Sequence, residues 1–226
     1  MAPHARYRHP SDLPAALPVF PLRGAILLPR ATLPLNVFEP RYLDLLDHVI
    51  SGARVLGIIQ PQANDEMEES PQGSDVALKD VGCAGRVTSF QEHDDGRLLI
   101  SLSGIARFRA HGEIATDDPF RTLDVTYDEF ADDLTSGAGE DDVDRERLLE
   151  VLQDYLNARQ LQADWQAINK APTELLVNSL STISPFGPEE KQALLEAKDL
   201  KQRAEVLATL ALMELASDDR SGGSLQ

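Results

Sequence analysis

Cysteine is almost absent from this sequence: Cys83 is the single one among 226 residues. One cysteine excludes an intramolecular disulfide and any metal site built from several cysteines. Cys83 stands among small residues, in Val-Gly-Cys-Ala-Gly, so we interpret it as a small apolar strand residue rather than a reactive thiol. The five histidines show no ligand spacing. We therefore predict no metal site.

Runs of lysine and arginine are also missing. The chain has 38 acidic and 21 basic residues, which gives a formal net charge of −17. Such a surface repels phosphate backbones and anionic lipid, so nucleic acid and membranes are disfavoured as partners. No apolar stretch approaches the length of a membrane span, and the charged N-terminus is not followed by the apolar segment of a secretory signal. These patterns predict a cytoplasmic protein.

Motifs for catalytic or nucleotide chemistry are missing as well. The sequence has no Gly-x-x-x-x-Gly-Lys-[Ser/Thr], no Gly-x-Gly-x-x-Gly, no Gly-x-Ser-x-Gly and no His-Glu-x-x-His. Carboxylates gather in loops, where they more often solvate the surface than form a catalytic pair. Lys170, Lys191, Lys198 and Lys201 lie in charge-rich helical contexts and are predicted to be exposed. We predict no enzyme activity, no catalytic residue and no cofactor.

Short apolar segments predict a β-rich first half. Strands are expected near residues 18–22, 33–38, 54–60, 85–92, 97–103, 105–115 and 120–127. Asp94-Asp95-Gly96 is the strongest local signal, because Asp-Gly supplies the positive φ angles of a hairpin turn. A helix is expected to begin at Pro40, and the acidic residues 61–80 are expected to form a surface loop.

The second half has a helical pattern. Helices are expected around residues 148–156, from Pro172, from Pro188 and across 199–216. We divide the chain into a flexible lead-in (1–13), a β-rich lobe (14–130), an acidic linker (131–142), a helical lobe (143–216) and a disordered tail (217–226).

Two segments carry a family resemblance. One runs from Leu17 to Tyr42 and ends in Leu-Pro-Leu-Asn-Val-Phe-Glu-Pro-Arg-Tyr; the other is Glu-Glu-Lys-Gln-Ala-Leu-Leu-Glu from Glu189, followed by Asp199 and Arg203. Together they resemble the N-terminal substrate-binding domain of bacterial Lon protease, over most of residues 14–215. The resemblance implies an α+β fold, with a β-rich, PUA-like pseudo-barrel lobe followed by a C-terminal helical bundle.

In Lon this region helps to recognise unfolded substrates, and it precedes an AAA+ ATPase and a peptidase. This chain stops at Gln226, so we expect a free-standing bacterial member without either module. The resemblance implies unfolded or extended polypeptide, or another protein, as the partner, and a role as an adaptor or quality-control factor. The oligomeric state is left open.

Apolar loop residues are the candidates for polypeptide binding. Ile26, Leu27, Leu28 and Pro29 lie between two expected strands, and Phe186 lies between a proline and a glycine. Exposed apolar side chains of this kind suit extended polypeptide. The alternative is that the loop covers the barrel mouth and completes the core.

We interpret the Phe38–Tyr42 motif as structural. Phe38 and Tyr42 are expected to pack the barrel, Glu39 to satisfy free N–H groups at a helix start, Pro40 to begin that helix, and Arg41 to pair with a carboxylate.

Arg203 falls in the apolar arc of the last helix. It either packs its stem and extends its head to water, or forms a bidentate pair with a carboxylate across the lobe interface.

Two other functions stay open. PUA-like relatives suggest RNA binding, which the net charge opposes. A cleft between the lobes could serve a small-ligand sensor or a hydrolase.

Overall fold

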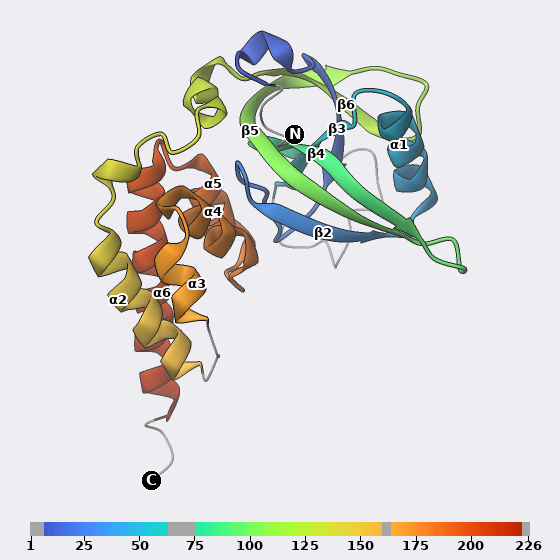
Figure 1. The fold of residues 1–226 in the computed structure, drawn as a ribbon. Coiled ribbons are helices and arrows are strands. Elements are labelled where there is room, and N and C mark those ends of the chain that lie inside the picture. Colours follow the sequence, from blue (N-terminus) through green and yellow to red (C-terminus); the bar gives the residue numbers. More distant parts are fainter. Residues whose placement is uncertain (1–6, 63–75, 160–163, 223–226) are drawn as a thin grey trace.

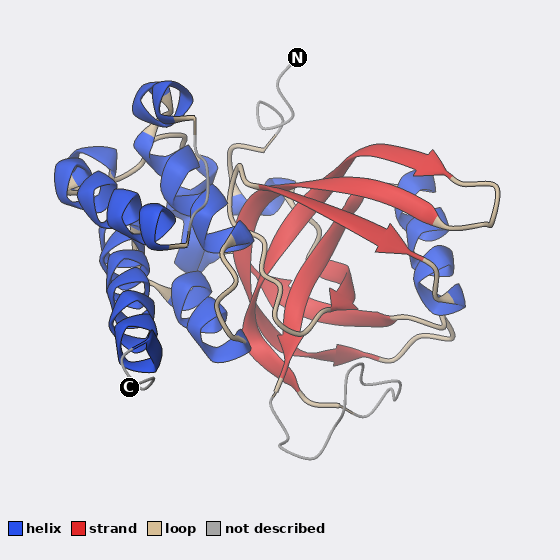
Figure 2. Ribbon diagram, turned by 90° about the horizontal axis from the view of Figure 1, so that it is seen from below, coloured by secondary structure: helices blue, strands red, loops and turns tan. Residues whose placement is uncertain are grey.

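The computed structural model describes residues 7–62, 76–159 and 164–222, with side chains described as far as Ala216. It confirms an α+β fold. A β-rich lobe lies beside a helical lobe, and the two are consecutive in the chain (Figure 1). Viewed from below, the strands curve around one lobe while most helices gather in the other (Figure 2).

Five strands of the β-rich lobe close into a barrel. The described strands are β1 (Ala16–Pro21), β2 (Thr32–Val37), β3 (Val55–Pro61), β4 (Leu78–Glu92), β5 (Leu98–Ile114) and β6 (Arg121–Thr126). Their order is β2-β5-β4-β3-β1-β6, and β6 also pairs with β5, which closes the ring. Strand β2 lies outside the ring, on β5. Helix α1 (Pro40–Ser51) follows β2 and packs four buried side chains on the core: Tyr42, Leu45, Leu46 and Val49.

The long β4–β5 hairpin turns at the predicted Asp-Gly, where Gly96 has a φ of 80°. The prediction of separate strands at 97–103 and 105–115 is wrong, because β5 is continuous through Gly104. The ladder shifts register between Ala84 and Gly85, so the strands bend there without ending. The predicted 61–80 loop is also too long, since β3 reaches Pro61 and β4 begins at Leu78; residues 63–75 lie outside the described ranges.

The helical lobe contains α2 (Arg145–Ala158), α3 (Trp165–Lys170), α4 (Thr173–Ile183), α5 (Pro188–Glu196) and α6 (Leu200–Gly222). Four of these were expected. Helix α3 was missed because it is short; its start is fixed by the Asp164 side chain, which accepts a hydrogen bond from the Ala167 N–H at 3.0 Å. The tail predicted to be disordered from 217 is helical to Gly222, because no proline or glycine interrupts residues 200–221.

The connection between the lobes consists of short 3₁₀ helices. η3 (Asp128–Leu134) follows β6, and η4 (Glu140–Asp142) precedes α2. The lead-in was predicted to be flexible, but part of it packs on the barrel. Tyr7 and Leu13 are buried against the barrel interior, and η2 (Pro10–Asp12) lies between them. Residues 1–6 lie outside the described ranges. The division into domains stays a prediction.

The main hydrophobic core extends through both lobes. Leu27, Leu28 and Leu46 of the β-rich lobe belong to the same cluster of buried side chains as Leu194 and Leu207 of the helical lobe. A second cluster, which includes Phe108 and Tyr127, fills the barrel. The lobes are therefore joined by shared apolar packing as well as by the chain.

Candidate functional site

The apolar loop proposed for polypeptide binding is buried. Ile26, Leu27, Leu28, Pro29 and Phe186 all lie in the interior. The loop is tied to its surroundings through the main chain: the Asn178 amide donates to the Pro29 carbonyl at 3.0 Å, and the Arg30 N–H donates to the Gly104 carbonyl at 2.9 Å. The alternative interpretation, a loop that completes the core, matches this packing. Binding at these residues stays a prediction that requires the loop to open.

The Phe38–Tyr42 motif is only partly as expected. Pro40 begins α1, Tyr42 is buried and stacked on Phe20 with ring centroids 4.0 Å apart, and Arg41 pairs with Glu39 at 2.9 Å. Two expectations are wrong. The Phe38 side chain is 63% exposed rather than packed in the barrel. The Glu39 side chain bonds Arg41 and makes no capping hydrogen bond to the described N–H groups of the helix.

Three exposed apolar side chains lie around one end of the sheet, and we call them the hairpin-end surface: Phe38, Phe90 and Leu99. They are 63%, 54% and 41% exposed. Phe38 directly follows β2, while Phe90 and Leu99 lie on the paired arms of the β4–β5 hairpin. Phe90 pairs with Ile100 and Leu99 pairs with Gln91, so these two side chains extend from opposite faces of the hairpin. The sequence predicted that Phe38 packs the barrel, and it singled out neither Phe90 nor Leu99, because residue type alone does not show which apolar side chains stay exposed.

Strand β2 brings a free sheet edge to the same place. Among the described strands it pairs with β5 alone. Its half-buried Leu35 starts an apolar row across three strands, through Ile100 of β5 to Phe90 of β4. Pro34, in the middle of β2, has no N–H to offer to a further strand.

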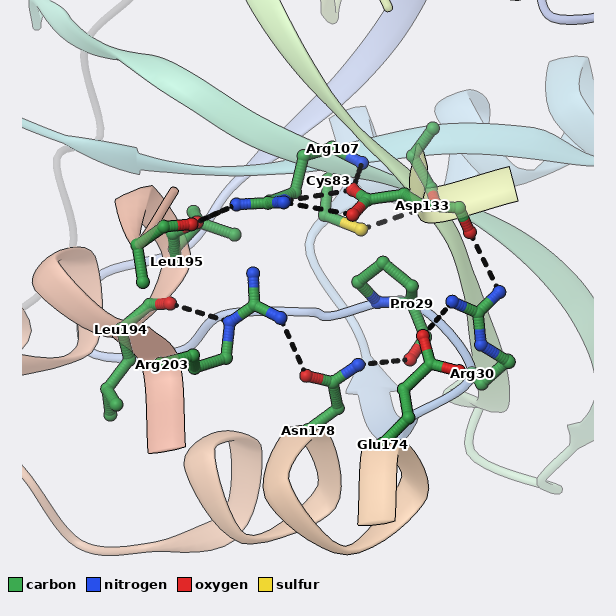
Figure 3. A network of polar contacts seen from close by, with 12 residues as sticks. Pro29, Arg30, Cys83, Arg107, Asp133, Glu174, Asn178, Leu194, Leu195 and Arg203 are labelled. Atoms are coloured by element: carbon green, nitrogen blue, oxygen red, sulfur yellow. Dashed lines mark hydrogen bonds and ion pairs between the residues drawn. The ribbon is translucent and has the colours of Figure 1, made fainter. Parts of the chain in front are cut away.

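A buried arginine network joins the lobes (Figure 3). Arg107 of β5 forms a bidentate ion pair with Asp133 of η3, with Nε and Nη2 each 2.9 Å from a carboxylate oxygen. Its Nη1 donates to the carbonyls of Leu195 and Ala197 at the end of α5. Arg107 therefore connects the barrel, the 3₁₀ connection and the helical lobe.

Arg30 adds a second ion pair to this network. It lies at the end of the apolar loop with a φ of 63°, bonds Glu174 of α4 and donates through Nη1 to the Asp133 carbonyl at 2.8 Å. Glu174 also accepts the Gly137 N–H at 2.9 Å. No sequence pattern predicts this pair, because its partners are 144 positions apart.

Both interpretations of Arg203 are wrong. The residue is 2% exposed, so its head does not reach water. Its Nε donates to the Leu194 carbonyl at 2.9 Å and its Nη1 to Asn178 Oδ1 at 2.8 Å, and no carboxylate of the described residues pairs with it. Burial lowers the pKa of Arg203, and the nearby Arg107 cation lowers it further.

Lys191 was predicted to be exposed, and this is also wrong. It packs inside the helical lobe, where Nζ donates to the Thr182 carbonyl at 2.8 Å near the end of α4. Burial lowers the pKa of its amine. Lys170, Lys198 and Lys201 are exposed, as expected.

Cys83 is a fully buried residue of β4, as expected, and burial raises the pKa of its thiol. Within the described ranges, no three His, Cys, Asp or Glu side chains are grouped to hold a metal ion. No helix there has the length and hydropathy to cross a membrane.

A family model described as the substrate-binding domain of ATP-dependent protease La (LON) matches residues 16–211. A Lon protease of Flavobacterium johnsoniae is 27% identical over 90% of this chain and 24% of its own length, and one of Desulfosudis oleivorans is 28% identical over 84% and 23%. The chain therefore spans about a quarter of the length of these curated relatives.

Two solved structures show the same fold. A Lon N-terminal domain protein from Xanthomonas campestris has a TM-score of 0.60 and 24% identity, over 86% of this chain and 97% of that one. The N-terminal domain of a Mycobacterium avium complex Lon protease has a TM-score of 0.61 and 17% identity, over 87% and 97%.

Proposed function

The chain belongs to the family of substrate-binding domains of the ATP-dependent protease La (Lon), and we therefore propose that it is a non-catalytic module that binds unfolded or extended polypeptide. The observation that carries the proposal is the family match over residues 16–211, which includes both lobes. We further propose that it acts as an adaptor or a quality-control factor.

The hairpin-end surface is the proposed place of contact. Exposed apolar side chains can bind the apolar residues that a folded protein would bury. Such binding requires no particular sequence in the bound polypeptide. The neighbouring β2 edge can pair with the backbone of an extended segment, as in other cases of strand addition. Pro34 removes one donor from that edge, so binding is expected to depend mainly on the apolar contacts and to be reversible.

Net charge determines which polypeptides the module is expected to bind best. With 38 acidic and 21 basic residues, the module attracts basic polypeptides and repels acidic ones. The same charge keeps a complex with an unfolded chain soluble.

The test compares binding of a permanently unfolded, cysteine-alkylated basic polypeptide with binding of its folded form, by fluorescence anisotropy. The double variant Phe38→Ser/Phe90→Ser should raise Kd for the unfolded form about tenfold, which corresponds to ~1.4 kcal/mol. Met213→Ser is the matched control, because Met213 is as exposed as Phe38 but lies on α6. The proposal fails if the folded and unfolded forms bind equally well. Equal losses in the variant and the control would remove the hairpin-end surface as the contact.

The adaptor role has its own test. The chain is added to purified Lon protease and an unfolded substrate, and the rate of degradation is measured. An adaptor should change that rate, and Phe38→Ser/Phe90→Ser should abolish the change. An unaltered rate of degradation would contradict the adaptor role but would not contradict polypeptide binding.

A further inference from the structure

A cavity of about 260 Å³ lies against the arginine network, between the two lobes. Its lining comes from β5, the 128–142 connection, α4 and the start of α6. Four of the lining side chains are buried members of the network: Arg107, Asp133, Glu174 and Arg203.

Arg203 has unused hydrogen-bonding capacity beside this cavity. A guanidinium has five N–H groups, and the described residues accept from two of those of Arg203. Its Nη2 is buried and has no partner among them. Figure 3 shows this nitrogen directed toward the Arg107 guanidinium, away from Leu194 and Asn178. An unpaired buried donor is destabilising, so an acceptor at this position would be stabilising.

The charge of the network is also unbalanced. It contains three guanidinium groups and two carboxylates, and the carboxylates are already paired, Asp133 with Arg107 and Glu174 with Arg30. The Leu194 carbonyl, in the last turn of α5, offsets part of the charge on Arg203 through the helix dipole. A buried cation without an anionic partner is costly, and a bound carboxylate would supply the missing negative charge.

The exposed lining has the opposite sign. Asp132, Asp142 and Asp199 are exposed acidic residues on the cavity lining, and Lys198 is the one exposed basic residue among the lining side chains. The exposed aspartates would repel a simple anion as it approaches the cavity. A molecule with both a carboxylate and a cationic group would match the buried guanidinium and the exposed aspartates. The volume is below the roughly 300–1,000 Å³ of pockets for drug-sized ligands, so the ligand must be small.

We propose that this cavity binds an amino-acid-sized carboxylate that also carries a cationic group. The carboxylate accepts hydrogen bonds from Arg203, and the cationic group faces the exposed aspartates. A free basic amino acid and the C-terminal basic residue of a polypeptide share this chemistry. The site is separate from the hairpin-end surface, so it does not depend on the proposed function.

The test is isothermal titration of the whole chain with four probes. L-lysine should bind, while L-lysinamide, which lacks the carboxylate, and hexanoate, which lacks the cation, should bind at least tenfold more weakly. The dipeptide Ala-Lys distinguishes the two sources: tighter binding than lysine indicates a polypeptide C-terminus, and weaker binding indicates a free amino acid. Equal binding of lysine and lysinamide, or no binding of lysine, would overturn the proposal.

Two variants locate the site. Asp132→Asn/Asp142→Asn changes exposed side chains and should weaken lysine binding about tenfold without moving the urea midpoint. Asp44→Asn/Asp47→Asn is the matched control on exposed positions of α1 and should leave binding unchanged. Arg203→Lys keeps the positive charge but removes the forked N–H donors of the guanidinium. This variant should bind lysine and lysinamide equally well. If both site variants bind lysine as the parent does, the cavity is not the binding site.

Discussion

Two arginine–carboxylate pairs of the same geometry lie two residues apart on β5 and differ mainly in burial. Arg107 pairs with Asp133 in the interior, and Arg109 pairs with Glu129 at the surface; both carboxylates belong to η3. Removing one partner of a buried pair leaves an uncompensated charge, while an exposed pair is screened by water. The comparison separates burial from hydrogen-bond geometry within one pair of elements.

Asp133→Asn should therefore lower the free energy of unfolding by about 3–5 kcal/mol. Glu129→Gln, the matched control, should lower it by no more than about 1 kcal/mol. Urea denaturation of the two variants beside the parent measures both values. Equal costs would mean that Arg107 does not depend on its ion pair for its place in the interface.

Lys191 gives a prediction on pH. Burial lowers the pKa of its amine in the folded state, so the unfolded chain binds more protons between that lowered pKa and the usual value of about 10.4. The destabilisation caused by burying the charged amine is fully present below the pKa of the folded state. It decreases as the pH rises toward the pKa of the unfolded state. Relative to Lys191→Met, the parent should therefore gain stability from pH 8 to pH 10.

Denaturation of both proteins at several pH values tests this. The Met variant is the reference because it keeps Cys83 and Tyr127, whose raised pKa values act on stability in the opposite direction. A difference between the two proteins that stays constant with pH would show that the Lys191 amine titrates normally.

At the scale of elements, the apolar loop and β5 are held at contact distance through a glycine. A Cβ placed on Gly104 would lie 2.0 Å from the Leu28 carbonyl oxygen, which belongs to the backbone and cannot rotate away. Gly112, on the same strand, has no described atom within 4 Å of an added Cβ.

Gly104→Ala should lower the free energy of unfolding by about 3 kcal/mol, at the upper end of overpacking effects, whereas Gly112→Ala should change it by less than about 1 kcal/mol. Limited proteolysis should also cut the Gly104→Ala protein within residues 25–31, because the loop is displaced from the barrel. If that loop stays protected and stability is unchanged, it packs on β5 less closely than the distances indicate.

The sequence predicted most elements, because their signals are local. Pro40 and Pro188 begin helices, and Asp95-Gly96 turns the β4–β5 hairpin. The site was harder to predict, because its groups meet only through tertiary contacts. Arg203 bonds a backbone carbonyl, which no residue pattern encodes. The exposure of Phe38 and Phe90 was missed for a different reason: apolar side chains beside a sheet edge or a hairpin end can stay exposed, and residue type alone does not reveal this.

At the scale of the whole molecule, the shared core and the arginine network predict that the two lobes unfold together. Asn178 of α4 contributes to both, since it bonds the Pro29 carbonyl of the apolar loop and the Arg203 side chain. A linker at 131–142 between independent domains would instead allow the helical lobe to unfold first.

The chain carries one natural probe in each lobe. Its single tryptophan, Trp165, begins α3, and its single cysteine, Cys83, is buried in β4. Trp165 fluorescence and pulsed thiol labelling of Cys83 should therefore give the same urea midpoint, because a two-state transition moves all probes together. Asn178→Ala should lower both midpoints equally. If Trp165 fluorescence changes at a lower urea concentration than Cys83 becomes reactive, the lobes unfold separately, and the interface that forms the cavity does not join them into one cooperative unit.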